Sequence, residues 1–441
     1  MPPDPTDPAI LARRTTPHQR LVDALSIEAW PLPLSLLPPG SALVGGAVRD
    51  GLLGRLRERP DLDLVVPGDG LAMSRRLARE LGGTAVVLDP ERSIGRLVLQ
   101  GWTIDLARQR GDTLVEDLAR RDFTINALAV ALPLAGQPLA LVDPLGGMED
   151  LRQRRLRAIA EANLLDDPLR LLRGPRLAAE LGFTMTPETW DWTVRHRARL
   201  GSVAGERVLA ELLRLVEADD GARGVDLLVR GGLLDSWIAP SASSAPAAFA
   251  VAHPSPLLPP ATHLTPEAAR LRGLTEAEAR SALPIARLAA LLDESTLRAL
   301  RASNKLRSRC RQLRRWRQRL VALDRADQGL GGLPEAEQLE LHRQLEGDLP
   351  ALLLDLTPSQ AAAALRRWRD PEDPLFHPRP PVDGLELQKA LGLPPGPRLG
   401  RLLDHLMRER AFGRLPRHDP ADSRTLQLAR RWIAATADSL P

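Results

Sequence analysis

Two aspartates, Asp61 and Asp63, alternate with apolar residues in the run 61–66, and this pattern constrains the fold more than any other part of the sequence. Successive side chains of a strand point to opposite faces, so both carboxylates share one face and leave the other face apolar. Two carboxylates roughly 6.5–7 Å apart along one strand can grip a hard divalent cation and leave room for phosphate oxygens. The pattern predicts a strand with one face on a core and the other in a cleft.

A glycine pair, Gly45 and Gly46, precedes this strand, and Arg49 follows the pair closely. Glycines let backbone N–H groups approach an anion, and a guanidinium adds a charged fork. Asp105, in the second strand of a hairpin predicted over 97–106, can complete a ligand set or accept a proton from an attacking hydroxyl. A solvent-exposed strand aspartate is the alternative interpretation of Asp105. A metal beside a phosphate cradle is what nucleotidyl transfer needs.

The composition sets further limits on the class of protein. A chain of 441 residues holds more than one domain, and its one cysteine, Cys310, excludes a disulfide framework and a Cys-rich zinc site. The net charge is only +4, so nucleic-acid binding must be argued from local clusters of arginine. No run is apolar enough to span a membrane and no signal-peptide pattern begins the chain, so we expect a cytoplasmic protein without a membrane partner.

The run 116–127 contains Arg121, Asp122 and Asn126. The arginine can reach a phosphate or ribose, and the aspartate and asparagine can hydrogen-bond sugar hydroxyls. The alternative is the capped start of a helix, with Asp122 or Thr124 as the cap and Asn126 buried.

The run 166–176 predicts a helix that Asp166 or Asp167 caps and Pro168 begins. Four charged residues recur along one side of it: Asp167, Arg170, Arg173 and Arg176. A carboxylate acceptor beside a guanidinium donor can mimic a base-pairing edge, and the other arginines can hold a triphosphate. A solvated charge stripe is the alternative, and Pro175 is expected to interrupt the helix near Arg176.

A basic stretch covers 298–319, with many arginines, one lysine, no acidic residue and Trp316 inside. We expect it to form a helix that follows RNA phosphates, with the indole as a stacking group. The candidate RNA contacts are Lys305, Arg311, Arg314 and Arg315.

The glycine pair with Asp-x-Asp, the Arg-Arg-Asp run at 120–122 and the charged run 166–176 together resemble the bacterial tRNA nucleotidyltransferase and poly(A) polymerase family. The resemblance implies an α+β head with a polymerase-β-like sheet, followed by an all-α neck, body and tail. It also implies catalytic Asp61, Asp63 and Asp105, with Mg²⁺ on the first two. The nucleotide would be held by Gly45, Gly46, Arg49, Arg121, Asp122, Asn126, Asp167, Arg170, Arg173 and Arg176.

The expected segments are a flexible arm at 1–20, the catalytic head at 21–145, the neck with the nucleotide-selecting residues at 146–237, a Pro/Ala/Ser-rich loop at 238–265, and an RNA-binding body and tail at 266–360 and 361–441. Family members that add the whole CCA end carry a sizeable loop between the third carboxylate and the Arg-Arg-Asp run, and members without it stop after CC. Here that loop shrinks to a few residues around 110–113. We therefore expect CC addition to tRNA from CTP, with a separate A-adding enzyme as partner. Full CCA addition from CTP and ATP, a poly(A) polymerase and an inert RNA-binding protein remain alternatives.

Overall fold

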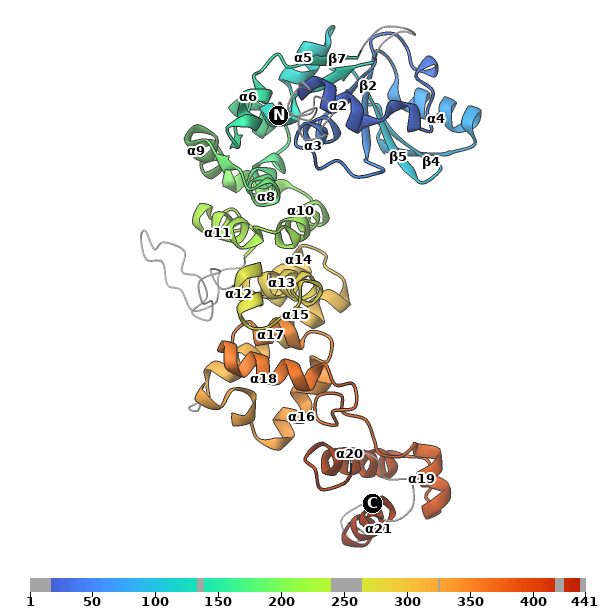
Figure 1. Cartoon of the computed structure of the whole chain (residues 1–441), viewed down its shortest axis with the longest axis vertical. Helices are drawn as coiled ribbons and strands as arrows, with labels where there is room; N and C mark the ends of the chain where they lie inside the picture. The colour runs from blue at the N-terminus through green and yellow to red at the C-terminus, as the bar shows by residue number, and fades with distance from the viewer. Residues whose placement is uncertain (1–16, 133–138, 239–263, 324–325, 417–423, 437–441) are drawn as a thin grey trace, which may run out of the picture. The chain divides into compact units, whose positions relative to one another are not determined.

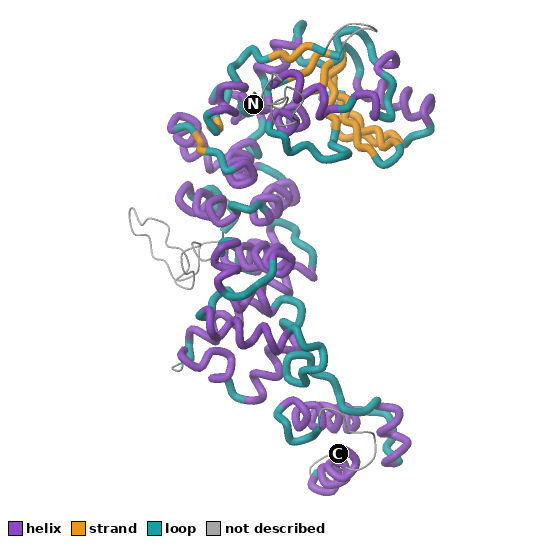
Figure 2. The backbone as a smooth tube through the Cα atoms, in the orientation of Figure 1, coloured by secondary structure: helices purple, strands orange, loops and turns teal. Residues whose placement is uncertain are grey.

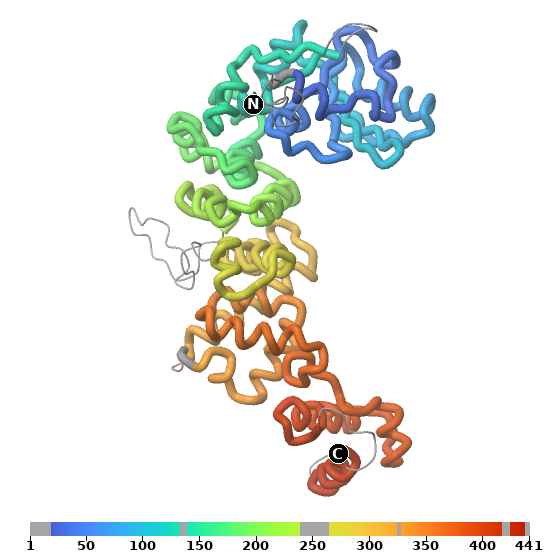
Figure 3. Tube along the Cα trace, viewed as in Figure 1, coloured from blue at the N-terminus to red at the C-terminus, as the bar shows by residue number. Residues whose placement is uncertain are grey.

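The computed structural model describes residues 17–132, 139–238, 264–323, 326–416 and 424–436 (Figure 1). Most of the predicted arm and of the predicted loop at 238–265 lies outside these ranges. The chain divides into two compact units, 1–202 and 203–441, so the boundary falls inside the predicted neck. Figure 3 follows the chain through both units from blue to red. One correction concerns the arm, because helix α2 (Pro17–Leu25) already includes residues 17–20 and buries Leu21 and Leu25.

The first unit is built on a seven-stranded sheet with the strand order β3-β4-β5-β2-β1-β6-β7 (orange in Figure 2). The strands are β1 (Ala42–Val44), β2 (Leu62–Val66), β3 (Thr84–Asp89), β4 (Ile94–Leu99), β5 (Trp102–Arg108), β6 (Ala129–Ala131) and β7 (Ala140–Val142). β2 and β5 run parallel, and the other neighbouring pairs are antiparallel. The predicted hairpin is confirmed as β4 and β5.

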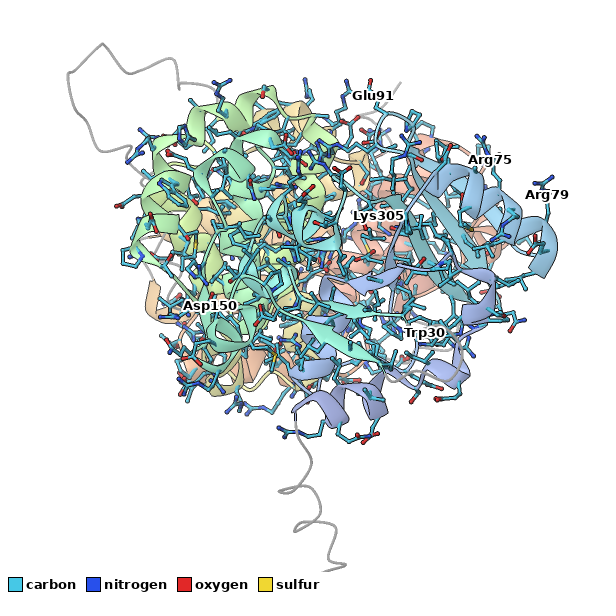
Figure 4. The ribbon with its side chains drawn as sticks, turned by 90° about the horizontal axis from the view of Figure 1, so that it is seen from above. Trp30, Arg75, Arg79, Glu91, Asp150 and Lys305 are labelled. Atoms are coloured by element: carbon cyan, nitrogen blue, oxygen red, sulfur yellow. The ribbon has the colours of Figure 1, made fainter. Side chains whose placement is uncertain are left out.

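Helix α4 (Gly70–Leu81) packs on β3, β4 and β5, and Asp69 caps its first turn by accepting from two backbone N–H groups. The packing is close, because a Cβ atom at Gly70 would lie 2.5 Å from the carbonyl oxygen of Leu106. Arg75 and Arg79 extend from the outward side of this helix (Figure 4). α4 covers one face of the β3–β5 half of the sheet. Asp63 and Asp105 lie on the opposite face.

The other helices of the unit are η1 (Ile27–Ala29), η2 (Leu34–Leu36), α3 (Gly46–Leu52), α5 (Leu114–Ala119), η3 (Thr124–Asn126), α6 (Gly147–Arg152), α7 (Glu161–Asp166), α8 (Arg170–Leu181), α9 (Pro187–Arg195) and η4 (Arg197–Ser202). The sequence predicted no strand beyond about residue 145. The structure nevertheless pairs β8 (Arg155–Leu156) with β9 (Thr184–Met185). Two-residue strands are too short to show an alternating pattern, so periodicity cannot reveal them.

The second unit is helical throughout its described residues. Its elements are α10 (Gly205–Glu217), α11 (Gly221–Gly231), α12 (Pro266–Leu271), α13 (Glu276–Leu291), α14 (Glu294–Ala299), α15 (Asn304–Val321), η6 (Ala326–Gly332), α16 (Glu335–Gln344), α17 (Leu349–Leu353), α18 (Pro358–Trp368), α19 (Gly384–Leu391), α20 (Pro397–Ala411) and α21 (Arg424–Ala435). The α+β head followed by helices is thus confirmed. Within the described ranges, no helix combines the length and the apolar content that a membrane crossing requires.

The arginines of α15 have partners inside the protein, which changes the interpretation of this helix. The Trp316 side chain is 1% exposed and its Nε1 donates to Gln344, so the stacking role predicted for it is wrong. Arg314 donates to the carbonyl oxygens of Ala289 and Leu292, and it braces α13 rather than facing solvent. Three further arginines form ion pairs with neighbouring helices: Arg309 with Asp348, Arg317 with Asp355 and Arg319 with Glu337.

The other candidate RNA contacts on α15 lie at the surface. Lys305, Arg311 and Arg315 are exposed, although Arg311 pairs with Glu294 and Arg315 with Glu340. Exposed ion pairs are worth about 0–1 kcal/mol, so a phosphate can replace either carboxylate. RNA contact at these three residues stays a prediction.

His342 makes the second unit sensitive to acid. Its buried imidazole lies 4.0 Å from the ring of Phe376 between centroids, and burial, followed by the charge of Arg367, lowers its pKa to about 3. The unfolded chain binds this proton near pH 6.5, so stability is lost as the pH falls below that value. From pH 7 to 5 the loss from His342 alone should be about 2 kcal/mol. Urea unfolding at both pH values should show a smaller loss for His342→Phe; an unchanged loss would contradict this assignment.

Candidate nucleotide site

Two predicted carboxylates lie abreast on neighbouring strands. Asp63 of β2 is in register with Asp105 of the parallel strand β5, and Val44 of β1 is opposite Asp63 on its other side. Asp61 immediately precedes β2 and is exposed. Residues in cross-strand register point to the same face of a sheet, so Asp63 and Asp105 share the face that α4 leaves uncovered.

The charges of these carboxylates disfavour one another. Burial first, and then the neighbouring charges of Asp105 and Asp61, raise the pKa of Asp63 to about 6, although Arg121 opposes them. A divalent cation at Asp61 and Asp63 would offset this repulsion, and carboxylate oxygens suit a hard cation. The donor set therefore fits a metal at these two residues.

Asp105 has a different partner. Both of its carboxylate oxygens accept from Arg96, at 2.7 Å from Nε and 2.9 Å from Nη2. Among the described residues, no three acidic, histidine or cysteine side chains are grouped so as to surround one ion. Asp105 is thus paired with Arg96, a residue that the sequence did not single out. Arg96 immediately precedes the predicted hairpin, and extending its register by one pair places Arg96 opposite Asp105.

A tight turn at Gly45 brings backbone next to this acidic face. Gly45 has φ +75°, and a Cβ atom there would lie 3.5 Å from Asp63 Oδ2 and 3.6 Å from Arg121 Nη1. Only glycine adopts this conformation without strain and leaves that space open. Gly46 begins α3, on which Arg49 is largely buried and donates to Asn126 Oδ1 at 2.7 Å. Gly45 and Arg121 therefore lie next to Asp63.

Asp122 and Asn126 lie behind this cradle and are both buried. Asp122 accepts from the backbone N–H of Phe123 and from Asn126 Nδ2, and Arg173 Nη2 lies 3.0 Å from its second oxygen. Burial acts to raise the pKa of Asp122, but the charges of Arg173 and Arg170 outweigh it and hold the pKa low. Asp122 positions Arg173 and Asn126 positions Arg49, as the alternative of a buried Asn126 implied. Both side chains are buried and are not placed to hydrogen-bond sugar hydroxyls directly.

The charged run 166–176 differs from the predicted helix in two ways. Asp167 precedes α8 and accepts from the backbone N–H of Leu169, so it does not lie on the helix. Pro175 lies inside a continuous α8, so the predicted interruption near Arg176 is wrong. The residue before it, Gly174, packs closely on Met185, where a Cβ atom would lie 2.9 Å from the methyl carbon.

The arginines of this run have separate roles. Arg170 donates through Nη1 to the carbonyl oxygens of Arg120 and Asn163, which holds it against the head. The Arg176 side chain is 3% exposed and pairs with Glu180 at 2.5 Å. The prediction that Arg176 holds a phosphate is therefore wrong, since burial on the core side of α8 keeps it from a ligand.

Comparison with known proteins agrees with this geometry. Residues 41–157 match the model described as Poly A polymerase head domain, and 182–245 match that described as probable RNA and SrmB- binding site of polymerase A. The CC-adding tRNA nucleotidyltransferase of Synechocystis sp. is 44% identical over 207 residues, which is 47% of this chain and 49% of the relative. The A-adding tRNA nucleotidyltransferase of Deinococcus radiodurans is 44% identical over 209 residues, 46% of each chain. The chain spans about half the length of the curated relatives it matches.

Solved structures share the fold. A CCA-adding enzyme with CTP has a TM-score of 0.67 at 20% identity and covers 95% of this chain and 98% of its own. The Thermotoga maritima CCA-adding enzyme complexed with tRNA has a TM-score of 0.63 at 20% identity, covering 89% and 91%.

The mixed sheet, the abreast carboxylates and the glycine turn define the class of nucleotidyltransferase head domains. Residues 41–157 and 182–245 resemble the bacterial tRNA nucleotidyltransferase and poly(A) polymerase family, as the motifs predicted. Enzymes of this family generally use divalent metal ions.

Proposed function

We propose that this protein is a tRNA nucleotidyltransferase that adds C to the tRNA 3′ end from CTP, with Mg²⁺ and release of pyrophosphate. The observation that carries the proposal is the placement of Asp63 between Asp105 on one side and the Gly45 turn with Arg121 on the other. That order sets a carboxylate pair next to an anion cradle on one open sheet face, which is what attack of a hydroxyl on a triphosphate requires.

Each residue has a part in the proposed reaction. The backbone at Gly45 and the guanidinium of Arg121 hold the triphosphate, with Arg49 behind them. Asp61 and Asp63 would hold Mg²⁺, which when bound neutralises charge on the phosphoryl oxygens. Asp105 accepts the proton of the attacking 3′-hydroxyl. The hydroxyl oxygen forms a bond to the α-phosphorus, and the bond from that phosphorus to the leaving pyrophosphate breaks.

Nucleotide choice falls to the residues that precede and begin α8. Asp167 offers an acceptor and Arg170 a donor, the pair that can match the edge of cytosine. The Nη1 atom of Arg170 is already bonded to the carbonyl oxygens of Arg120 and Asn163, which fixes the direction of its guanidinium. A base would meet a preformed edge.

The preference for C rests on the connection between β5 and α5. It consists of residues 109–113 alone, and three of its backbone N–H groups are bonded: that of Gln109 to the Val66 carbonyl oxygen, that of Arg110 to Asp117 and that of Asp112 to Glu116. Because this connection is short and its backbone is hydrogen-bonded, we expect it to be unable to move far enough to rearrange the nucleotide-selecting residues. The expected product is a CC end, which a separate A-adding enzyme would complete.

Incorporation of labelled CTP and ATP, tested separately with Mg²⁺, checks this proposal. The tRNA transcripts would end at the discriminator base, at C and at CC. We expect CTP to be used on the first two and ATP not to be used on the third. ATP use on the CC end would show full CCA or A addition, and long ATP-derived tails on unstructured RNA would show a poly(A) polymerase.

A further inference from the structure

A row of side chains crosses the sheet at the level of Asp63 and continues past the catalytic pair. Asp105 is in register with Arg96 of β4, and Arg96 with Val86 of the edge strand β3. Gly95 next to it faces α4, because a Cβ atom there would collide with Ser74. Arg96 therefore points to the open face, on the side of Asp105 away from the Gly45 turn.

The guanidinium of Arg96 uses only one of its edges. Nε and Nη2 donate to the two oxygens of Asp105, and within the described ranges no group accepts from Nη1. A guanidinium carries five N–H donors in a plane, so the second edge still offers a fork for an anion. The Arg96 side chain is 40% exposed, which leaves that edge within reach of a ligand.

The in-line geometry of the proposed reaction indicates which anion would bind the free edge of the Arg96 guanidinium. In phosphoryl transfer the attacking and leaving oxygens lie roughly in line. The Gly45 turn and Arg121 hold the triphosphate on the β1 side of Asp63, so the hydroxyl must approach from the Asp105 side. An RNA strand that ends at Asp105 brings its last phosphate towards the next strand, β4. Beyond Arg96 the sheet face is open, with Val86 45% and Val98 41% exposed.

We propose that Arg96 positions the RNA 3′ end, holding Asp105 by one edge of its guanidinium and the last internucleotide phosphate by the other. The hydroxyl of the terminal nucleotide is thereby aligned with the carboxylate that takes its proton. This inference rests on the proposed function. It makes Arg96 a positioning residue, since it acts through Asp105 and the RNA backbone and not on the reacting phosphate.

A matched change in the protein and in the RNA tests the proposal. Arg96→Gln should lower kcat/KM for a tRNA transcript by about 10–100-fold, the size expected for a lost hydrogen bond between charged groups, and leave the KM for CTP within about 2-fold. A transcript with a neutral methylphosphonate at its last linkage should cost the wild type a similar factor. The same transcript should cost Arg96→Gln less than about 3-fold, because the partner of that phosphate is already gone. RNA affinity measured without CTP should show the same pattern, and Arg96→Lys should recover part of the loss.

Arg92→Gln is the matched control. Arg92 lies in the turn between β3 and β4, where its Nε is 3.9 Å from the carboxylate of Asp89, and its side chain is 45% exposed. It should change none of these values. The role of Arg96 would be overturned if the losses in kcat/KM from Arg96→Gln and from the methylphosphonate multiplied in combination. It would also be overturned if Arg96→Gln mainly raised the KM for CTP. Absence of any incorporation by the wild type would instead overturn the proposed function. The unfolding midpoint of each variant shows whether it is folded. If Arg96→Gln is not folded, Arg96→Lys takes its place in the same measurements.

Discussion

An Asp63→Asn variant should lose nucleotide incorporation by a factor of about 10³ or more, because it removes a ligand charge worth several kcal/mol at the reacting phosphate. The same change should stabilise the protein in metal-free buffer. The folded chain holds the Asp63 proton up to about pH 6, whereas an unfolded aspartate releases it near pH 3.9, so ionising this carboxylate costs stability as the pH rises from 4 to 6. Asparagine avoids that cost, which we expect to be about 1–3 kcal/mol at pH 8.

Labelled CTP incorporation and urea unfolding in the presence of a chelator measure the two effects. Asp23→Asn is the control, since Asp23 is an exposed aspartate on α2 of the same unit and lies outside the carboxylate row. It should alter neither activity nor stability. Retained incorporation by Asp63→Asn would remove this residue from the reaction. Lower stability in the variant would show that the neighbouring charges do not oppose Asp63.

The sequence was sufficient to predict the parts of the head in which local patterns and pairing agree. Alternation located β2, and the hairpin signal located β4 and β5. The chemistry of glycine in a turn also placed Gly45 near a carboxylate. Each of these depends on residues close in the chain, so no knowledge of long-range packing was needed.

The failures share one physical cause, because charge in a sequence does not say where its partner lies. The arginines of α15 were expected to bind RNA since the helix has no acid of its own. Their partner carboxylates come instead from other segments of the second unit. Asp348 precedes α17, Asp355 follows α17 and Glu337 lies on α16. Asp122 was misjudged for the same reason, because only the fold brings Arg173 near it. Arg176 pairs with Glu180 four residues further along α8, and what the sequence did not show was that its side chain is buried.

Asp150, labelled in Figure 4, is the strongest example of such pairing, and it underlies the second large effect that we expect. Its side chain is 0% exposed, and its two oxygens accept from Thr124, Arg155 and Arg157 at 2.6–3.1 Å. The carboxylate thus ties α6 to β8 and to the start of η3. A buried charge therefore holds the segment together at this point.

An Asp150→Ala variant should therefore unfold with about 2–4 kcal/mol less stability than the wild type. That range is below the largest costs of breaking buried ion pairs, since Arg155 and Arg157 are partly exposed and can regain water. Urea unfolding of the whole chain measures the loss. Glu149→Ala is the control from the next position on α6, where the carboxylate also pairs with an arginine, Arg152, but at the surface; its midpoint should stay unchanged. Equal effects of the two variants would mean that the buried carboxylate of Asp150 does not hold the segment together.

A further consequence of the Asp150→Ala change reaches the nucleotide site. Thr124 begins η3, and the last residue of η3 is Asn126, which accepts from Arg49 and donates to Asp122. Loosening η3 should weaken the hold on both side chains behind the cradle, so the KM for CTP should rise more than kcat falls. The opposite split would indicate that Asp150 supports the reacting carboxylates instead, because a displaced Asp63 or Asp105 slows the chemical step and leaves nucleotide binding intact.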